Sequence, residues 1–342
     1  MSDSQFLRAC RREPTSFTPI WLMRQAGRYQ PEYRALRAKY SFIEMCKNPE
    51  LAAEVTLLPV AQLNVDAAII FADILLILEP LGIGFHFSKD DGPRIDKPIR
   101  NAAHVNEVAS LIDPEESLGY VLEAIRNTRS GLPSSVPLIG FAGAPFTLAS
   151  YMIEGGGSRD YIHTKTLMFG DPGAWHALMQ KLTAAVTLYL NAQVRAGAQA
   201  LQVFDSWIGC LSPSDYTSYV QPHMTQLFAG VDKSVPIIHF GAGNPSLYPL
   251  MRDAGGDVIG VDFRADLGAT WDALGETAVM GNLDPYSLLA PRAELQHRAQ
   301  RVLDGACGRA GHIFNLGHGV FPEANIDQIK ILVDYVHQAS AR

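Results

Sequence analysis

The sequence has 342 residues, of which 47% are hydrophobic and 18% are charged, and this composition is typical of a soluble globular protein with a large core. Its formal net charge is −7 at pH 7, whereas proteins that bind nucleic acids or anionic membranes usually carry positive charge, so both classes of partner are disfavoured. The most apolar stretch, residues 66–85, is interrupted by Asp73, Glu79 and Pro80, so no transmembrane helix is predicted.

The cysteines are far apart in the sequence and none forms a C-x-x-C pair, which disfavours both a disulfide framework and a structural zinc site. They are Cys10, Cys46, Cys210 and Cys307. The first ten residues lack the basic and then apolar pattern of a secretory signal. These features predict a protein of a reducing compartment.

Short apolar runs rich in Val, Ile and Phe recur along the chain, and most of them end at Gly, Asp, Asn or Ser. They are nearly continuous rather than alternating, which is typical of parallel strands that are buried on both faces. The predicted strands are residues 19–23, 67–71, 137–141, 200–204, 236–240, 258–261, 278–281 and 312–315.

The segments between these runs have helical periodicity, most clearly at residues 49–63, 171–197 and 325–339. Eight strands that alternate with helices predict an α/β fold of the (β/α)₈ TIM barrel type. No Ser/Gly linker divides the chain, so residues 1–342 are expected to form a single domain with a short N-terminal extension. A doubly wound open sheet is the alternative, weakened because no G-x-G-x-x-G follows the first run.

The barrel prediction indicates where a site would lie, because active sites of this fold occupy the carboxyl ends of the strands. Polar residues and glycines that directly follow the apolar runs are therefore expected at one rim. They are residues 24–28, Asp73, Gly143, Asp205, Ser206, Gly241, Asp262, Asn282, Gly317 and His318.

The first of these rim segments is strongly basic. Residues 1–40 hold eight Lys and Arg against three acids, a local charge of +5. If residues 24–28 form a helical turn, Arg24 and Arg28 lie on one face, and Gly27 allows a ligand to approach the backbone. Arginine forks suit carboxylates and phosphates. A solvated helix face with internal ion pairs is the alternative, but only Glu32 is a nearby acid, which favours an external anion.

Four further rim residues each have a functional and a structural interpretation. Asp73 either caps a helix or presents a carboxylate to N–H donors or to developing positive charge. Tyr151 is either a core tyrosine or a site residue. Ser206 lacks a G-x-S-x-G context, which favours a ligand contact or a turn over a nucleophile. His318 lies between two glycines, which favours a ligand or acid–base role, while no Cys, Asp or Glu cluster supports a metal.

These residues occur in five stretches that together closely resemble the uroporphyrinogen decarboxylase family of tetrapyrrole biosynthesis. The stretches are PIWLMRQAGRYQPEYRALR, AAIIFADIL, GFAGAPFTLASYMIEGGGSRDY, VFDSWIG and FNLGHGV, and the resemblance extends from about residue 6 to 334. It implies a homodimeric (β/α)₈ barrel of the bacterial cytoplasm, without metal or other cofactor. The implied reaction converts the four acetate side chains of uroporphyrinogen III to methyls and gives coproporphyrinogen III.

The resemblance also implies roles for individual residues. The family's anion-binding stretch matches Arg24, Gln25, Ala26, Gly27 and Arg28. Its essential aspartate matches Asp73, and its remaining substrate-binding residues match Tyr151, Ser206 and His318. Asp73, Arg24 and Arg28 are accordingly expected to act in catalysis.

Two other functions remain as alternatives. Barrels of the same superfamily transfer methyl groups with zinc and need His and Cys ligands near the barrel mouth, but neither Cys210 nor Cys307 belongs to a His-x-Cys pair. A non-enzymatic tetrapyrrole carrier would keep the arginines and could lose Asp73. The presence of Asp73 favours the enzyme.

Overall fold

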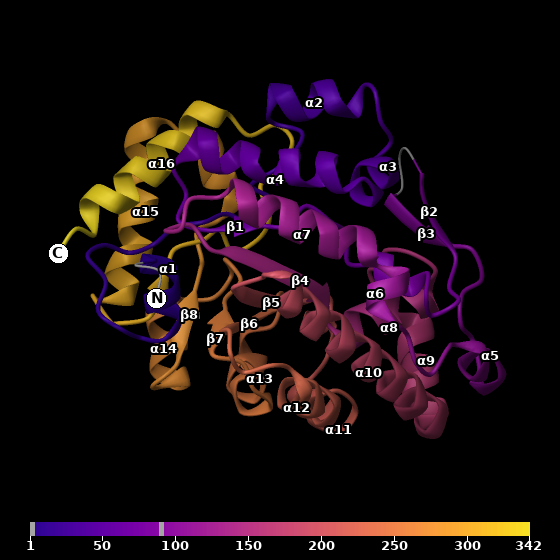
Figure 1. The fold of residues 1–342 in the computed structure, drawn as a ribbon. Coiled ribbons are helices and arrows are strands. Elements are labelled where there is room, and N and C mark those ends of the chain that lie inside the picture. The colour runs from indigo at the N-terminus through magenta and orange to yellow at the C-terminus, as the bar shows by residue number, and fades with distance from the viewer. Residues whose placement is uncertain (1–3, 89–91) are drawn as a thin grey trace.

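The computed structural model describes residues 4–88 and 92–342; residues 1–3, where the predicted N-terminal extension begins, and residues 89–91 lie outside the description. Figure 1 shows a curled sheet at the centre of the molecule with helices around it. All neighbouring strands of this sheet are parallel, and their order in the sheet is their order in the chain. The strands are β1 (Ala68–Ile69), β4 (Leu138–Gly143), β5 (Ala200–Asp205), β6 (Ile237–Gly241), β7 (Val258–Gly260), β8 (Ala278–Met280) and β9 (His312–Ile313).

The first predicted strand, residues 19–23, closes the sheet between its two edge strands. On one side Ile20 pairs in parallel with Phe314, and the Phe314 N–H donates to the Pro19 carbonyl at 2.8 Å. On the other side the Asp66 N–H donates to the Ile20 carbonyl at 2.8 Å. The barrel prediction is therefore confirmed, with one correction: residues 19–23 form a bridge rather than a regular strand.

The order of the strands decides between the two predicted topologies. A doubly wound sheet reverses its strand order at a switch point, whereas this sheet follows the chain without reversal. The doubly wound alternative is therefore wrong.

The three most periodic segments form helices with almost the predicted bounds: α4 (Pro49–Leu63), α10 (Pro172–Ala196) and α16 (Ile326–Ala339). The start of α10 is set by Asp171, whose side chain accepts a hydrogen bond from the Ala174 N–H at 3.0 Å. Its end is set by Gly197, which has a left-handed φ of 116°. No helix in the described part of the chain is long and apolar enough to cross a membrane.

The other helices connect the strands or cover the barrel. They are α1 (Gln5–Cys10), α2 (Pro31–Arg37), α3 (Phe42–Lys47), α5 (Ala102–Glu107), α6 (Pro114–Ser117), α7 (Gly119–Gly131), α8 (Pro145–Glu154), α9 (Ile162–Gly170), α11 (Pro213–Tyr219), α12 (Gln221–Gly230), α13 (Tyr248–Ala254), α14 (Leu267–Leu274) and α15 (Arg292–Ala306). Short 3₁₀ helices are η1 (Leu76–Leu78), η2 (Ile208–Cys210), η3 (Pro245–Leu247) and η4 (Pro285–Leu289).

A small hairpin, β2 (Phe85–Ser88) and β3 (Gly92–Ile95), lies outside the barrel sheet and was not predicted (Figure 1). The Ile95 N–H donates to the Gly155 carbonyl at 3.0 Å, directly after the end of α8. The long connection that follows β1 is thereby fastened to the helix that follows β4.

The barrel interior is packed rather than open. Ile139, Ile238, Val258 and Met280 face inward from four strands and form one buried cluster that also contains Phe6 of α1. Since α1 packs against β9 and against this cluster, it covers the amino-terminal end of the barrel. The carboxyl ends of the strands are left to form the site.

Candidate functional site

The parallel ladder brings the predicted rim residues to one end of the barrel. Gly143, Asp205 and Gly241 are the last residues of β4, β5 and β6, which are adjacent in the sheet. Asp73 follows β1 by four residues, and the segment 24–28 follows the closing bridge at Ile20.

The segment 24–28 is not a helical turn, so that prediction is wrong. The Gln25 N–H donates to the Leu22 carbonyl at 2.9 Å, which closes a tight turn, and Arg24 has a left-handed φ of 60°. A left-handed conformation is unfavourable for a residue with a Cβ atom and is kept only where the surroundings impose it. Here the Met23 N–H donates to the Asn315 side-chain oxygen at 3.0 Å, and this bond to the last strand segment holds the chain off a helical path.

Gln25 supports this turn from inside the protein. Its side chain is buried, its Oε1 accepts from the Leu22 N–H at 3.1 Å and its Nε2 donates to the Ala67 carbonyl at 3.1 Å. Both polar ends are thus bonded to the scaffold, which makes Gln25 a support of the turn, and its predicted contact with a substrate stays a prediction. Ala26 and Gly27 are half-buried, so their backbone partly reaches the surface.

Arg24 and Arg28 are both exposed, and neither forms an ion pair with a carboxylate of the described residues. The alternative interpretation was a solvated helix face with internal ion pairs. For Arg24 and Arg28, the described part of the structure does not show such ion pairs. They differ in their surroundings. The charge of Arg24 acts on Asp73 and His318, whereas the charge of Arg28 acts on Tyr33.

The loop after β9 holds the stem of Arg24. A Cβ atom at Gly319 would lie 2.4 Å from Cδ and 2.8 Å from Cγ of Arg24, so the arginine stem rests directly on this glycine. The neighbouring His318 reaches the surface. Partial burial and the charge of Arg24 lower the pKa of His318, so its ring is neutral at pH 7.

A change of Gly319 to alanine is expected to lower kcat/KM by about tenfold, because the new methyl group displaces the Arg24 stem. The melting temperature should change little, since a flexible side chain rather than backbone has to move. Steady-state kinetics and thermal unfolding measure the two effects. Gly119→Ala is the matched control, because a Cβ there meets no atom within 4 Å. Equal kcat/KM values for Gly319→Ala and Gly119→Ala would show that the contact between Gly319 and the Arg24 stem does not affect activity.

Asp73 combines the two roles considered for it. Its Oδ1 accepts from the Leu75 N–H at 2.8 Å, which forms a turn before η1, while no partner in the described residues bonds its Oδ2. Burial raises the pKa of Asp73 to about 6, against the lowering effects of the Leu75 N–H and of the Arg24 charge. The carboxylate is mostly ionised at pH 7 and has one oxygen available to a ligand.

Tyr151 projects from α8 toward the same place. Burial raises the pKa of its hydroxyl to about 12, and the Asp73 charge adds to this effect. Its ring packs edge-on against Trp207, with centroids 5.2 Å apart. Tyr151 therefore keeps its proton at neutral pH and can act as a hydrogen-bond donor beside Asp73.

Ser206 is exposed at the end of β5, next to an acid that is fully buried. Asp205 Oδ1 accepts from the Thr147 hydroxyl at 3.0 Å, and burial raises the pKa of Asp205 to about 7. The Thr147 hydroxyl oxygen also accepts from the backbone N–H of Trp207 at 3.4 Å, so Asp205 and Thr147 help to hold the residue whose ring packs on Tyr151. Sequence reasoning missed Thr147 and Trp207, although both lie in stretches it had singled out.

The remaining predicted rim residues serve the framework. The buried Asp262 carboxylate is paired with the Arg264 guanidinium and also accepts from the Arg264 N–H. Asn282 donates to the Asp262 and Ala265 carbonyls at 3.0 and 2.8 Å. Of the predicted site residues, the structure thus brings Asp73, Tyr151 and His318 within the electrostatic influence of Arg24, with Ser206 exposed at the same end of the barrel.

The family model described as "Uroporphyrinogen decarboxylase (URO-D)" matches residues 1–339. The chain belongs to the uroporphyrinogen decarboxylase family. Its relatives include the uroporphyrinogen decarboxylases of Sorangium cellulosum, 56% identical over 97% of this chain and 95% of the relative, and of Carboxydothermus hydrogenoformans, 54% identical over 100% and 97%. The uroporphyrinogen decarboxylase of Koribacter versatilis is 52% identical over 99% and 97%.

Solved structures of other enzymes share the fold of this uroporphyrinogen decarboxylase family member. A methyltransferase from Methanosarcina mazei has a TM-score of 0.82 with 21% identity and 98% coverage of both chains. A B12-independent methionine synthase from Shewanella sp. W3-18-1 has a TM-score of 0.59 with 9% identity, covering 88% of this chain and 90% of its own. At these identities the likeness concerns the fold alone.

The cysteines considered for a zinc site lie far from one another. Cys210 belongs to η2, after the carboxyl end of β5, whereas Cys307 ends α15 and precedes the amino end of β9. The two thiols therefore lie at opposite ends of the barrel. Among the residues that the structure describes, no group of three or more His, Cys, Asp or Glu side chains is placed to hold a metal ion.

Proposed function

We propose that this chain is a carboxy-lyase that converts the four acetate side chains of uroporphyrinogen III to methyls, giving coproporphyrinogen III. One observation supports it above all: the charge of Arg24 acts on Asp73, which is mostly ionised. In the described residues one oxygen of Asp73 has no hydrogen-bond partner, and Arg24 has no ion pair. We further propose that residues 1–342 act as one catalytic domain.

This pair of charges is complementary to the substrate. Uroporphyrinogen carries eight carboxylates around its edge and four pyrrole N–H groups at its centre. The free Asp73 oxygen can accept hydrogen bonds from pyrrole N–H groups, and the guanidinium groups of Arg24 and Arg28 can bind carboxylates. Neutral His318 and protonated Tyr151 add uncharged hydrogen-bonding groups at the same rim.

The chemistry requires an electron sink for the carbon–carbon bond electrons. A proton added to the ring carbon next to the acetate makes the pyrrole cationic, and the bond to the carboxylate then breaks and releases CO₂. The electron pair returns to the ring, and the exocyclic carbon takes up a proton as the ring proton leaves. Asp73 stabilises the cationic ring, and because the substrate itself supplies the sink, the proposal needs no cofactor.

The first step needs a donor for the proton that the ring carbon takes up. A guanidinium group keeps its proton throughout the physiological pH range and is a poor acid, so direct transfer from Arg24 is disfavoured. The electrostatic effect of Arg24 on Asp73 supports placing Arg24 nearest the reacting acetate, where it can orient a water. Arg28 and His318 then bind the other carboxylates.

A change of Arg28 to lysine is expected to raise KM by about tenfold while kcat stays within about threefold, because the bidentate fork is lost and the positive charge is kept. Steady-state kinetics under anaerobic conditions provide both values. Arg159→Lys, in an exposed loop, serves as the matched control. A fall in kcat alone would show that Arg28 acts on the chemical step instead.

Release of CO₂ from uroporphyrinogen III, measured anaerobically together with the methylated product, tests the proposed function. We expect four CO₂ per coproporphyrinogen, and the same rate after exhaustive chelation. A protein that binds the porphyrinogen without releasing CO₂ would be a carrier. Activity lost on chelation and restored by zinc would overturn the cofactor-free mechanism.

The proposal includes a cytoplasmic homodimer, which rests on the family resemblance. Sedimentation equilibrium at micromolar protein concentration measures the mass of the particle, and a value of twice 37.3 kDa is expected. A monomer at all concentrations would refute the proposed homodimer and would leave the proposed reaction unaffected.

A further inference from the structure

A third arginine, Arg264, lies at the same end of the barrel as Arg24 and Arg28. It belongs to the loop after β7, four residues beyond the end of that strand, and its side chain is 53% exposed. Loops that follow the parallel strands of a barrel share one rim, so this loop lies at the end that carries Asp73. The proposed mechanism does not use Arg264, which is therefore a further cation at the mouth of the site.

The loop that carries Arg264 is held in one shape. Asn282 Nδ2 donates to the Asp262 carbonyl at 3.0 Å and to the Ala265 carbonyl at 2.8 Å, which fastens both ends of the loop. The Ala265 N–H donates to the Asp262 carbonyl at 3.2 Å and closes a turn. The Asp262 N–H in turn donates to the Tyr248 hydroxyl at 2.8 Å. The backbone at Arg264 is thus preorganised, which reduces the cost of binding a ligand there.

The guanidinium group of Arg264 is bonded to the protein at one edge and is open at the other. Its Nη1 donates to Asp262 Oδ2 at 2.5 Å, and the Arg264 backbone N–H donates to Oδ1 at 2.7 Å. The group also lies over the Phe263 ring, with its central carbon 4.3 Å from the ring centroid. No partner among the described residues bonds Nε or Nη2. These two N–H donors can bind one carboxylate through parallel hydrogen bonds.

The loop after β9, which presents His318, contacts the segments of both Arg24 and Arg264. A Cβ atom at Gly317 would lie 2.5 Å from Cα and 2.6 Å from Cβ of Phe263, so the residue before His318 rests on the residue before Arg264. The glycine after His318 rests on the stem of Arg24. One short loop is therefore flanked by two guanidinium groups.

The electrostatic effects of these arginines place Arg264 farther than Arg24 from Asp73. Burial lowers the pKa of His318, and the charges of Arg24 and Arg264 add to this effect, while that of Asp262 opposes it. Burial raises the pKa of Asp73, and of these two arginines only Arg24 acts against it. Because Asp73 is proposed to face the pyrrole N–H groups at the centre of the substrate, Arg264 lies nearer the edge of the macrocycle.

We propose that Arg264 binds a propionate carboxylate of the substrate beside His318, through its Nε and Nη2. The inference rests on the proposed function and extends it. Each pyrrole ring of uroporphyrinogen carries one acetate and one propionate, and the propionate is longer by one carbon and so reaches farther from the ring. The propionates also survive the reaction, so this contact is available in all four decarboxylations. Arg264 acts in binding and leaves the chemical step to the other side chains.

Binding of coproporphyrinogen III tests this proposal, because that product keeps the propionates and has lost the acetates. Equilibrium dialysis under anaerobic conditions, with the ligand quantified after oxidation, gives the Kd. We expect Arg264→Gln to raise the Kd about tenfold, through the loss of charge-assisted hydrogen bonds. The KM for uroporphyrinogen III should rise by a similar factor while kcat stays within about threefold.

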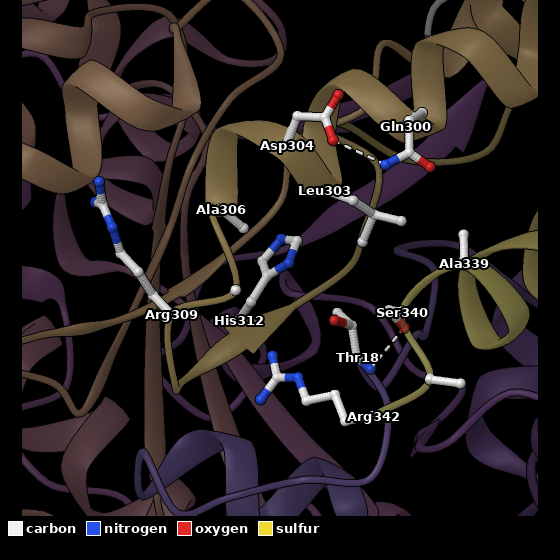
Figure 2. Close-up of a pocket in the computed structure, with 12 residues that line it drawn as sticks. Thr18, Gln300, Leu303, Asp304, Ala306, Arg309, His312, Ala339, Ser340 and Arg342 are labelled. Atoms are coloured by element: carbon white, nitrogen blue, oxygen red, sulfur yellow. Dashed lines mark hydrogen bonds between the residues drawn. The ribbon is translucent and has the colours of Figure 1, made fainter.

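Arg309→Gln is the matched control, because Arg309 makes the same two kinds of contact away from the site. Its Nη2 pairs with Asp272 at 2.6 Å, and its guanidinium group lies over the Trp271 ring at 5.4 Å. Figure 2 shows Arg309 at a pocket that includes His312, the first residue of β9, and therefore at the amino-terminal end of the barrel. This variant should bind coproporphyrinogen III with the wild-type Kd.

Arg264→Lys keeps the test decisive if Arg264→Gln fails to fold. Asp262 has a side chain that is 1% exposed, so glutamine leaves a buried carboxylate without its cation, whereas lysine can still pair with it. Lysine lacks the planar fork, so we expect a melting temperature near that of the wild type and a Kd raised at least about threefold.

The proposal is overturned if the folded Arg264 variants keep the wild-type Kd, or if Arg309→Gln raises the Kd as much as they do. A fall in kcat at unchanged Kd would make Arg264 a structural support of His318 instead. The wild-type protein separates this proposal from the proposed function. If the wild type neither binds coproporphyrinogen III nor releases CO₂ from uroporphyrinogen III, both fail. If it does both and the variants bind normally, only the role of Arg264 is refuted.

Discussion

Replacing Asp73 with asparagine is expected to lower kcat by about 100- to 1,000-fold while KM stays within about tenfold. The asparagine oxygen can still accept from the Leu75 N–H, so the turn before η1 persists. What disappears is the negative charge that stabilises the cationic pyrrole. Steady-state kinetics with uroporphyrinogen measure both constants, and circular dichroism verifies the fold.

Asp334→Asn is the matched control for this variant, because Asp334 is exposed on α16 and has no side-chain hydrogen bond in the described structure. It should retain full activity. Near-normal turnover in Asp73→Asn would remove the electrostatic role of Asp73 from the mechanism. A large rise in KM with unchanged kcat would make Asp73 a substrate-binding residue only.

Replacing Arg24 with glutamine is expected to lower kcat/KM by about 10- to 100-fold at pH 7, through the loss of a charge-assisted contact. It should also change the pH dependence. Arg24 lowers the pKa of Asp73, so its removal raises that pKa, with burial then opposed only by the hydrogen bond from the Leu75 N–H. The mechanism needs the ionised Asp73 carboxylate. As the pH is lowered, Arg24→Gln should therefore lose activity at a higher pH than the wild-type protein does.

Arg24→Lys separates these two effects. It keeps a positive charge near Asp73, so the acid limb of the pH–rate profile should stay near its wild-type position even though the bidentate contact is lost. Arg298→Gln, which removes an exposed arginine of α15, is the control for charge alone. An acid limb that does not move in Arg24→Gln would show that Arg24 and Asp73 are not coupled.

The barrel was predictable because its signals are local. Continuous apolar runs of Val, Ile and Phe identify strands buried on both faces, and the Asp–Pro start and Gly197 end of α10 are set by neighbouring residues. The location of the rim residues could be predicted from the fold, because the carboxyl ends of parallel strands meet at one end of the barrel. For this reason the sequence placed Arg24, Asp73, Tyr151 and His318 together without any contact being known.

The local shape of the arginine segment could not be predicted, because distant residues impose it. The four-residue spacing of Arg24 and Arg28 suits a helix, but bonds from Met23 to Asn315 and from Gln25 to Ala67 fix a turn instead. Thr147 and Trp207 were missed for a similar reason. Their importance comes from contacts with Asp205 and Tyr151 that no sequence spacing reveals.

The bridge between Ile20 and Phe314 joins segments almost 300 positions apart, and it has a consequence for biosynthesis. The turn that carries Arg24 is tied to Asn315 and rests on Gly319, so it cannot take its final shape until that distal region has emerged from the ribosome. Contacts of such long range form late because the intervening chain must first lose its freedom. A nascent polypeptide would therefore gain this arrangement of Arg24 only after residues 314–319 have left the ribosome and have paired with the segment around Ile20.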